Sequence, residues 1–376
     1  MPVHVSAAFD GGNAEVVDCA RPDDLKLQIR RDHLSEFMQW FYFRVTGVGG
    51  LDCVVKLVNA GEVTYPEGFR NYRAVASYDR QSWFRVATDF DGEVLTIRHR
   101  PAADSVYFAY FAPYSMERHA DLVARVALRP GVKAEVLGHT LDGQDLDLLI
   151  LGDPTRERLP CWVIGRQHPG ETMAEWWMEG FLDRLTDPYD PVSRSLLERA
   201  CFYVVPNMNP DGSRRGHLRT NAVGANLNRE WQTPSMERSP EVYLVRERME
   251  QIGVRFGLDV HGDEALPYNF IAGFEGIPAL TNGQLGLLED FRSRLAELCP
   301  DFQTAHGYPR NPPGQANLTM CTNYLAERYG CLAMTLEQPF KDSAVTPDPE
   351  RGWSPERCRA LARGCIDALH SSMPRL

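Results

Sequence analysis

The chain has 376 residues, of which 43% are hydrophobic, 24% charged and 10% aromatic, a composition ordinary for a globular protein with a well-filled core. Its formal net charge is -11, from 40 Lys+Arg against 51 Asp+Glu, and this excess of acid argues against a nucleic-acid binder. No window approaches the ~20 apolar residues of a membrane span, and the nine cysteines show no CxxC spacing, so we expect a cytoplasmic protein with reduced thiols and no membrane partner.

The first part of the chain has the pattern of a β domain. Short runs rich in Val, Tyr and Phe are separated by turn residues, which predicts strands. Asp91-Gly92 lies between two alternating runs and predicts a hairpin. About eight strands in a row without helices favour a small antiparallel β-sandwich, which we assign to residues 1–115. The runs are 3–9, 25–30, 40–48, 53–60, 73–79, 83–99 and 105–115.

Residues 116–376 have the pattern of an α/β domain with a largely parallel or mixed central sheet. A helical connector over 115–128 comes first, and a hairpin over 134–152 turns at Asp142-Gly143. Strands and helices then alternate, and sites in such sheets lie at strand ends. The loop 306–319, rich in Pro, Gly and Asn, is long enough to be a site loop. Expected strands are 160–166, 201–206, 256–261, 269–272 and 331–336; expected helices are 171–186, 236–252, 285–298 and 352–370.

Three histidines are followed three residues later by a glutamate: His33/Glu36, His168/Glu171 and His261/Glu264. The first pair lies in the charged stretch RRDHLSE and is interpreted as a solvated surface. His168 and His261 each follow an apolar strand run, so each is expected at a strand end. A catalytic zinc site needs three protein ligands and an open position, which His168, Glu171 and His261 could supply. Asp259, two residues before His261, could orient its imidazole, although strand alternation could also point it elsewhere.

Two further stretches strengthen the metal hypothesis. Arg214, Arg215, Arg219 and Arg229 fall within sixteen residues of an acidic chain, which indicates either a solvated loop or a recess for an anion, because Arg pairs with both oxygens of a carboxylate. Glu337 ends an apolar strand run, where an unpaired carboxylate would be costly, so a site role is favoured over a structural one.

Taken together, these motifs resemble the zinc carboxypeptidase superfamily in its cytosolic carboxypeptidase branch. The resemblance rests on HPGE (168–171), NPDG (209–212), RTNAVGANLNREW (219–231), DVHGDE (259–264) and TLEQPF (335–340), in this order. The branch also carries an N-terminal β-sandwich that ends near a phrase like YFAPYS. The resemblance therefore spans nearly the whole chain and implies a β-sandwich followed by a carboxypeptidase-like α/β domain with a mixed sheet.

The resemblance implies a role for each of these residues. His168, Glu171 and His261 would bind one Zn²⁺ per chain. Glu337 would be the general base that takes a proton from the zinc-bound water, and Arg219 would hold the oxyanion. Asn228 and Arg229 would grip the terminal carboxylate of a peptide or protein substrate, whose last residue is released. An acidic or side-chain-linked glutamate is one candidate for that residue.

Two departures from the family pattern bear on this assignment. Many relatives have Asp where this chain has Asn226, and a neutral amide orients a ligand histidine without adding charge. Members that remove glutamate carry an Arg some fifteen residues before the catalytic Glu, where this chain has Cys321, Thr322 and Asn323. Arg310 in the loop 306–319 is the one candidate substitute.

The sequence leaves alternatives open. A zinc deacylase of small N-acyl amino acids, of the aspartoacylase and succinylglutamate desuccinylase kind, shares the His-x-x-Glu…His set and a late glutamate. A catalytically silent binding protein, with the β-sandwich as its partner module, is a second alternative. The β-sandwich itself is either a packing partner or a device that narrows substrate access. The sequence indicates neither the oligomeric state nor the physiological substrate.

Overall fold

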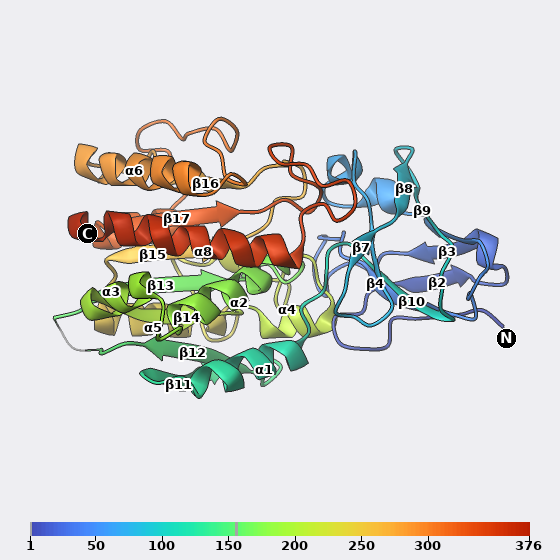
Figure 1. The fold of residues 1–376 in the computed structure, drawn as a ribbon, viewed down its shortest axis with the longest axis horizontal. Helices are drawn as coiled ribbons and strands as arrows, with labels where there is room; N and C mark the ends of the chain where they lie inside the picture. Colours follow the sequence, from blue (N-terminus) through green and yellow to red (C-terminus); the bar gives the residue numbers. More distant parts are fainter. Residues whose placement is uncertain (1, 155–156) are drawn as a thin grey trace.

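The computed structural model describes residues 2–154 and 157–376. Two small β-sheets lie at one end of the molecule and a larger α/β unit fills the other (Figure 1). The N-terminal strands are β1 (His4–Ser6), β2 (Glu15–Asp18), β3 (Leu25–Gln28), β4 (Tyr42–Thr46), β5 (Cys53–Leu57), β6 (Val75–Ser77), β7 (Phe84–Arg85), β8 (Ala87–Phe90), β9 (Leu95–His99) and β10 (Ser105–Ala109). Short 3-10 helices interrupt them at Pro22–Asp24, Ala60–Glu62 and Pro66–Phe69.

The N-terminal sheets confirm the predicted β-sandwich, with one difference. Their strand orders are β1-β4-β10-β6-β7 and β2-β3-β5-β9-β8. The pairs are antiparallel except β3 with β5, which run parallel. The predicted hairpin at Asp91-Gly92 joins β8 to β9. Burial alternates along β5, as expected for a sheet with one face on a core.

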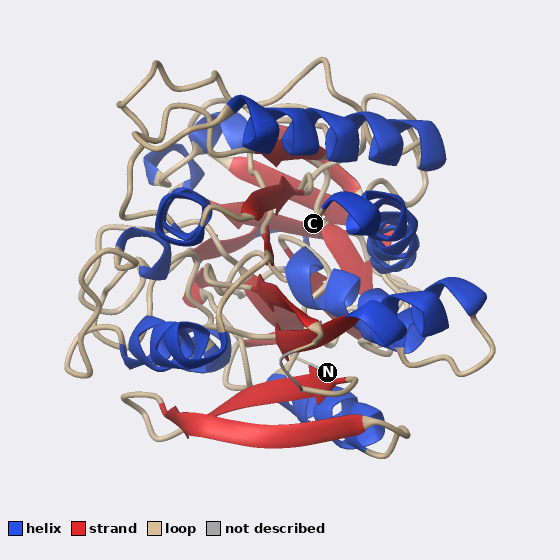
Figure 2. Ribbon diagram, turned by 90° about the vertical axis from the view of Figure 1, so that its left-hand side faces the viewer, coloured by secondary structure: helices blue, strands red, loops and turns tan. Residues whose placement is uncertain are grey.

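The larger sheet has seven strands in the order β11-β12-β14-β13-β15-β17-β16. Four central neighbours, β14, β13, β15 and β17, run parallel, whereas β11, β12 and β16 are antiparallel to their neighbours, so the predicted mixed sheet is confirmed. The strands are β11 (Val132–His139), β12 (Asp145–Leu151), β13 (Leu159–Gly165), β14 (Ala200–Val205), β15 (Phe256–Val260), β16 (Phe270–Ala272) and β17 (Leu332–Glu337). Helices cover both faces (Figure 2), which explains why β14, β15 and β17 are buried throughout.

The predicted helices are confirmed to within a few residues, and three helices were missed. The confirmed helices are α1 (Met116–Ala127), α2 (Met173–Leu185), α5 (Pro240–Ile252), α6 (Asn282–Leu298) and α8 (Pro355–Ser372). The missed ones are α3 (Pro191–Arg199), α4 (Pro210–Arg215) and α7 (Cys321–Tyr329); 3-10 turns also occur at Leu227–Arg229 and Met373–Arg375. Asp190 and Asn209 cap α3 and α4 and precede a proline, a start signal present in the sequence. The first N–H of α7 is instead bound by distant Asn228, which no local pattern reveals.

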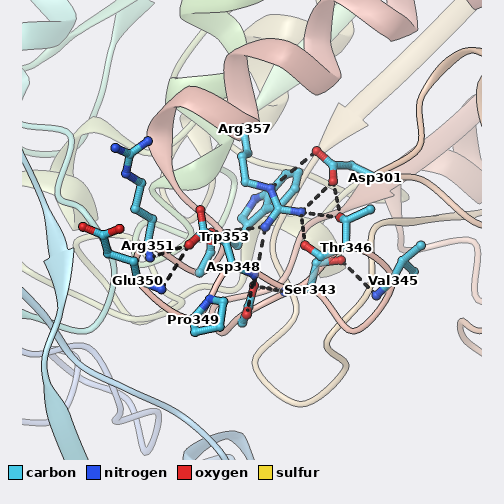
Figure 3. Close-up of polar contacts among 12 residues, drawn as sticks. Asp301, Ser343, Val345, Thr346, Asp348, Pro349, Glu350, Arg351, Trp353 and Arg357 are labelled. Carbon is cyan, nitrogen blue, oxygen red and sulfur yellow. Dashed lines mark hydrogen bonds and ion pairs between the residues drawn. The ribbon is translucent and has the colours of Figure 1, made fainter.

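The loop after β17 ties the two parts of the molecule together. Tyr110 at the end of the β domain stacks on Phe340 with ring centroids 4.4 Å apart. Buried Arg85 donates hydrogen bonds to the carbonyls of Phe340 (2.8 Å) and Trp353 (3.1 Å). From the other side, Arg357 of α8 donates to Asp301 (2.6 Å) and to the carbonyl of Thr346 (2.8 Å), as Figure 3 shows. The loop that follows Glu337 is therefore anchored to the β domain near Phe340 and to α8 near Thr346.

All nine cysteines are free thiols, as expected. Within the part of the chain that the structure describes, no helix combines the length and apolar character needed to cross a bilayer.

Candidate metal and catalytic site

Three adjacent parallel strands, β13, β15 and β17, bring the predicted site residues to one edge of the sheet. Gly165 pairs with Val260, and Val260 pairs with Leu336, so the three strands end level with one another. His261 directly follows β15, and its backbone N–H donates to the carbonyl of Leu336 (2.8 Å). Since parallel strands share a carboxyl edge, His168, His261 and Glu337 meet there although they are far apart in sequence.

His168, Glu171 and His261 form a compact buried cluster. Their ligand atoms all lie within 4.8 Å of one another. The Nδ1 atom of His168 is 2.6 Å from Oε1 of Glu171, and the Nδ1 atom of His261 is 2.8 Å from Oε2 of the same carboxylate. The two Nδ1 atoms are 3.2 Å apart. The structure thus brings together the three residues whose meeting the metal hypothesis requires.

The donor set fits a zinc ion. Two imidazole nitrogens and a carboxylate are ligands that Zn²⁺ takes in catalytic sites, and nitrogen ligands about 2.0–2.1 Å from a tetrahedral zinc lie roughly 3.4 Å apart. The separation of the two Nδ1 atoms, 3.2 Å, is close to that value. Each of the three residues is at most 4% exposed, so a bound ion would be shielded from bulk water on the protein side.

Electrostatics favour a cation at the centre of this cluster. Although burial alone would raise it, the two histidines hold the pKa of Glu171 well below its usual range. Burial, helped by the positive charge of Arg219, lowers the pKa of His168 to about 3, so this imidazole is neutral, as a ligand must be. His261 differs from His168. Burial opposes its protonation, but the negative charges of Asp259 and Glu171 raise the pKa of its imidazole well above the usual value, which indicates a negative potential around this ring.

The outer nitrogens of both imidazoles also face oxygen atoms. Nε2 of His168 lies 3.1 Å from Oδ1 of Asn226, and Nε2 of His261 lies 2.9 Å from Oδ2 of Asp259. Asp259 therefore lies beside the His261 ring, but the contact is a close charge contact and not the hydrogen bond that the sequence suggested. The same carboxylate accepts a hydrogen bond from Gln167 (2.6 Å), which keeps it in place. Such partners fix the tautomer and ring orientation of a ligand histidine.

Glu337 lies next to the cluster and is 6% exposed. Burial, opposed by His261 and reinforced by the nearby carboxylates, raises its pKa well above the usual value. The hydroxyl of Tyr308 donates its proton to Asp263 (2.6 Å) and lies 3.3 Å from one carboxylate oxygen of Glu337. The other oxygen is buried and has no hydrogen-bond partner among the described residues. Tyr308, a member of the loop 306–319, was not singled out from the sequence beyond the expectation that this loop lines a site.

The arginines of residues 214–229 do not act as one group. Arg214 is exposed, and Arg215 pairs with Asp142 at the surface (2.7 Å). Arg219 faces the cluster: its charge acts on His168, and the carboxylate of Glu171 is among the groups that raise the pKa of Arg219 against the effect of burial. Much of Arg229 is exposed. Partial desolvation lowers the pKa of its guanidinium group, and the positive charge of the neighbouring Arg219 lowers it further. The buried side chain of Asn228 accepts a hydrogen bond from the N–H of Cys321 (2.9 Å).

The glycines of HPGE and NPDG allow a close approach of backbone segments. A Cβ atom on Gly170 would lie 2.9 Å from the carbonyl oxygen of Leu218. A Cβ atom on Gly212 would lie 2.5 Å from the carbonyl oxygen of Thr220. The Leu218–Thr220 segment, with Arg219 at its centre, therefore packs directly against the backbone of both motifs.

A cavity of about 430 Å³ is lined by Tyr308, which also approaches Glu337, although His168, Glu171, His261 and Glu337 do not line it themselves. Its lining includes Thr322 and Asn323, where related glutamate-removing enzymes are expected to carry Arg, together with Arg310. The predicted substitute Arg310 is not free: it pairs with Glu289 (2.7 Å) and approaches Glu275 (3.5 Å). His33 and Glu36, by contrast, are exposed at the surface, so the first His-x-x-Glu match is accidental, as predicted.

These features define a candidate metal-dependent hydrolase site at the edge of a mixed sheet, and comparison with known proteins specifies the family. Residues 5–111 match the family model of the cytosolic carboxypeptidase N-terminal domain, and residues 121–254 match that of zinc carboxypeptidase. An uncharacterised protein of Zymomonas mobilis is 53% identical over 376 residues, which cover 100% of this chain and 98% of that protein.

Solved structures agree over the whole chain. A putative carboxypeptidase A from Shewanella denitrificans superposes with a TM-score of 0.97 at 51% identity, covering 99% of both chains. A metallo-carboxypeptidase from Pseudomonas aeruginosa, in complex with (2-guanidinoethylmercapto)succinic acid, has a TM-score of 0.97 at 45% identity, again over 99% of both chains. The chain belongs to the zinc carboxypeptidase family, with the N-terminal domain of its cytosolic branch, and is a metallocarboxypeptidase. These matches do not favour the small-molecule deacylase or the silent binding protein.

Proposed function

We propose that this protein removes the C-terminal residue of peptides or proteins with one Zn²⁺ per chain. The observation that supports this most directly is the convergence of His168, Glu171, His261 and Glu337 at the carboxyl edge of β13, β15 and β17. His168, Glu171 and His261 would hold the ion. Zinc at such a site supplies Lewis acidity, which polarises a carbonyl and can lower the pKa of a water molecule to about 7.

Glu337 is proposed as the general base. It is buried, its raised pKa makes its carboxylate a stronger base than that of an ordinary glutamate, and one of its oxygens has no protein partner among the described residues. That oxygen would accept a proton from the attacking water and later deliver it to the leaving amine. The hydroxyl of Tyr308 lies 3.3 Å from the other oxygen, on the opposite side of the carboxylate from the unpaired one.

Arg219, Asn228 and Arg229 are proposed to bind the substrate. Arg219 would donate to the oxyanion that develops on the scissile carbonyl, an interaction commonly worth about 3–4 kcal/mol in the transition state. Arg229 would pair with the terminal carboxylate, and the amide NH₂ of Asn228 would add a hydrogen bond, since its oxygen already accepts from Cys321. An internal peptide bond has no carboxylate at that position, so cleavage is confined to chain ends.

For the released residue, we propose a side chain that donates hydrogen bonds rather than a carboxylate. Asn323 lines the cavity, and its amide oxygen is buried without a partner in the described chain. The lining cations Arg292 and Arg310 are already paired with Glu275 and Glu289, which leaves them poorly placed to bind glutamate. The ligand named with the Pseudomonas aeruginosa relative combines a guanidino group with a succinic acid, which is compatible with a donor in this cavity and carboxylates near Arg229.

A peptide library read by mass spectrometry tests the function. Peptides of one sequence would end in Lys, Arg, Gln, Leu, Glu or a side-chain-linked glutamate, each as free acid and as C-terminal amide. We expect loss of one residue from the free acids, fastest for Lys, Arg or Gln, and no cleavage of the amides. Hydrolysis of N-acetylaspartate or N-succinylglutamate without peptide cleavage would replace the proposal with a deacylase, and preference for glutamate would overturn the cavity assignment.

We propose a cytoplasmic location, in keeping with the N-terminal domain that the chain shares with cytosolic carboxypeptidases. We further propose that its partners are peptide or protein C-termini, with no role for nucleic acid or membranes.

A further inference from the structure

The segment that carries Arg219 is held by a carboxylate from the β domain. Asp32 is 3% exposed and lies between β3 and β4. Its Oδ1 atom accepts a hydrogen bond from the backbone N–H of Leu218 (2.6 Å). Its Oδ2 atom accepts from the backbone N–H of Arg219 (2.8 Å) and from the N–H (2.9 Å) and hydroxyl (3.0 Å) of Thr220. The Asp32 side chain thus accepts hydrogen bonds from three consecutive backbone N–H groups that lie 186 or more positions later in the sequence.

On its opposite side, the Leu218–Thr220 segment packs tightly against the α/β domain. Gly170 donates its N–H to the carbonyl of Leu218 (2.9 Å), and a Cβ atom at Gly170 or Gly212 would collide with the segment. Leu218–Thr220 is therefore clamped between the HPGE and NPDG glycines of the α/β domain and Asp32 of the β domain. Hydrogen bonds from backbone amides to a buried ionised carboxylate are short and strong, so the clamp fixes the backbone direction at Arg219.

The same turn of the β domain also contacts the Arg219 side chain. The backbone N–H of Asp32 donates to the carbonyl of Phe37 (2.8 Å), which closes the turn and presents the Phe37 ring. The Arg219 guanidinium carbon lies 5.4 Å from the centre of that ring and 5.8 Å from the ring of Tyr65. Aromatic faces attract a guanidinium group at such distances. The β domain therefore acts on both the backbone and the side chain of Arg219.

We propose that Asp32 is a positioning residue for the reaction: the β domain uses it to hold Arg219 where the oxyanion develops. This inference rests on the proposed role of Arg219. It gives the β-sandwich a use beyond the two that the sequence leaves open, which are packing and the narrowing of substrate access. A displacement of about 1 Å at such a group can cost on the order of 10²-fold in rate.

The test is a double-mutant cycle on the full zinc-loaded chain. Asp32→Asn keeps the size of the side chain but replaces one accepting oxygen by an NH₂ group, which faces backbone donors. Arg219→Ala removes the proposed oxyanion donor. Asn13→Ala is the matched control: Asn13 is a buried residue of the β domain that donates to the carbonyl of Gly216 (2.8 Å), at the same interface but not to Leu218–Thr220. Each variant is assayed for kcat, KM, zinc content and melting temperature.

We expect Asp32→Asn to lower kcat roughly 10- to 100-fold with zinc content unchanged, and Asn13→Ala to lower kcat less than threefold even if both variants lose similar thermal stability. In the Arg219→Ala background, Asp32→Asn should cost less than threefold more. If the kcat losses of Asp32→Asn and Arg219→Ala instead multiply in the double mutant, Asp32 acts independently of Arg219 and the inference is overturned. A wild-type kcat for Asp32→Asn would also overturn it. If Asp32→Asn does not fold, Asp32→Glu, which keeps the charge but moves the carboxylate by one methylene, is used in the same cycle and gives the same decision. Full activity of Arg219→Ala would instead refute the proposed role of Arg219.

Discussion

The Nδ1 atoms of His168 and His261 lie 3.2 Å apart although 93 positions separate the two residues in the chain. If the two Nδ1 atoms were much farther apart, the two histidines could not bind the same ion. The distance is small because β13 and β15 are adjacent parallel strands, and each histidine comes just after the end of its strand. The carboxylate of Glu171 then faces both rings, which completes a three-ligand cluster.

His261→Ala should abolish stoichiometric zinc binding. Removing one of three ligands leaves His168 and Glu171, which are too few for a stable catalytic zinc site. We expect about one zinc per wild-type chain and a small fraction of that in the variant, measured by atomic emission after dialysis against a weak chelator. Treatment of the wild type with a strong chelator should remove activity, and added Zn²⁺ should restore it. An unchanged metal content in the variant would refute the ligand assignment.

Glu337→Gln should separate metal binding from turnover. The amide keeps the size of the side chain but cannot accept a proton, so kcat should fall by about 10²–10⁴-fold with zinc still bound. Glu241→Gln is the control, because Glu241 is another buried glutamate, whose pKa burial raises to about 8, and it lies outside the cluster. This control should retain activity. Substantial activity of Glu337→Gln would remove Glu337 from its proposed role.

Asn226→Asp should strengthen zinc binding. Oδ1 of Asn226 is 3.1 Å from Nε2 of His168, and a charged acceptor there would make the imidazole a better electron donor. We expect about tenfold tighter binding, and 10- to 100-fold weaker binding for Asn226→Leu, in competition titrations with a chromogenic chelator. Equal affinities for the three proteins would show that this contact does not tune the metal.

His119 should make the stability of the protein depend on pH. It is buried with Nδ1 2.7 Å from Glu175 and Nε2 3.1 Å from Asp147, and although burial opposes protonation, these carboxylates raise its pKa to about 9. Because the folded pKa lies above the unfolded value of about 6.5, the stabilisation is complete below pH 6.5 and is lost as the pH rises through 9.

The measurement compares the wild type with His119→Gln. The difference in free energy of unfolding between them should shrink by up to about 3 kcal/mol from pH 6.5 to pH 9. Urea denaturation at several pH values would show it, and parallel curves for the two proteins would contradict the ion pairs assigned to His119.

The sequence by itself determined the order of elements and the list of candidate site residues. Hydrophobic alternation and turn residues are local signals, so the hairpin at Asp91-Gly92 and the buried strands β13, β15 and β17 follow from them. The motifs around His168, His261 and Glu337 named the cluster because their residue types are those that zinc chemistry needs. Helices α3 and α4 were missed although Asp190-Pro191 and Asn209-Pro210 announce them.

The tertiary structure decided which of these residues act together. The strand order placed β13, β15 and β17 side by side, and pairing of distant strands is not encoded in any short window. It separated Arg219 at the cluster from Arg214 and Arg215 at the surface. The tertiary structure also gives the residues of one charged stretch, RRDHLSE, different environments. His33 and Glu36 are exposed, as their polarity predicts. Asp32 is buried, because the backbone N–H groups of Leu218–Thr220 donate hydrogen bonds to its carboxylate. A buried carboxylate depends on partners that only the folded chain supplies.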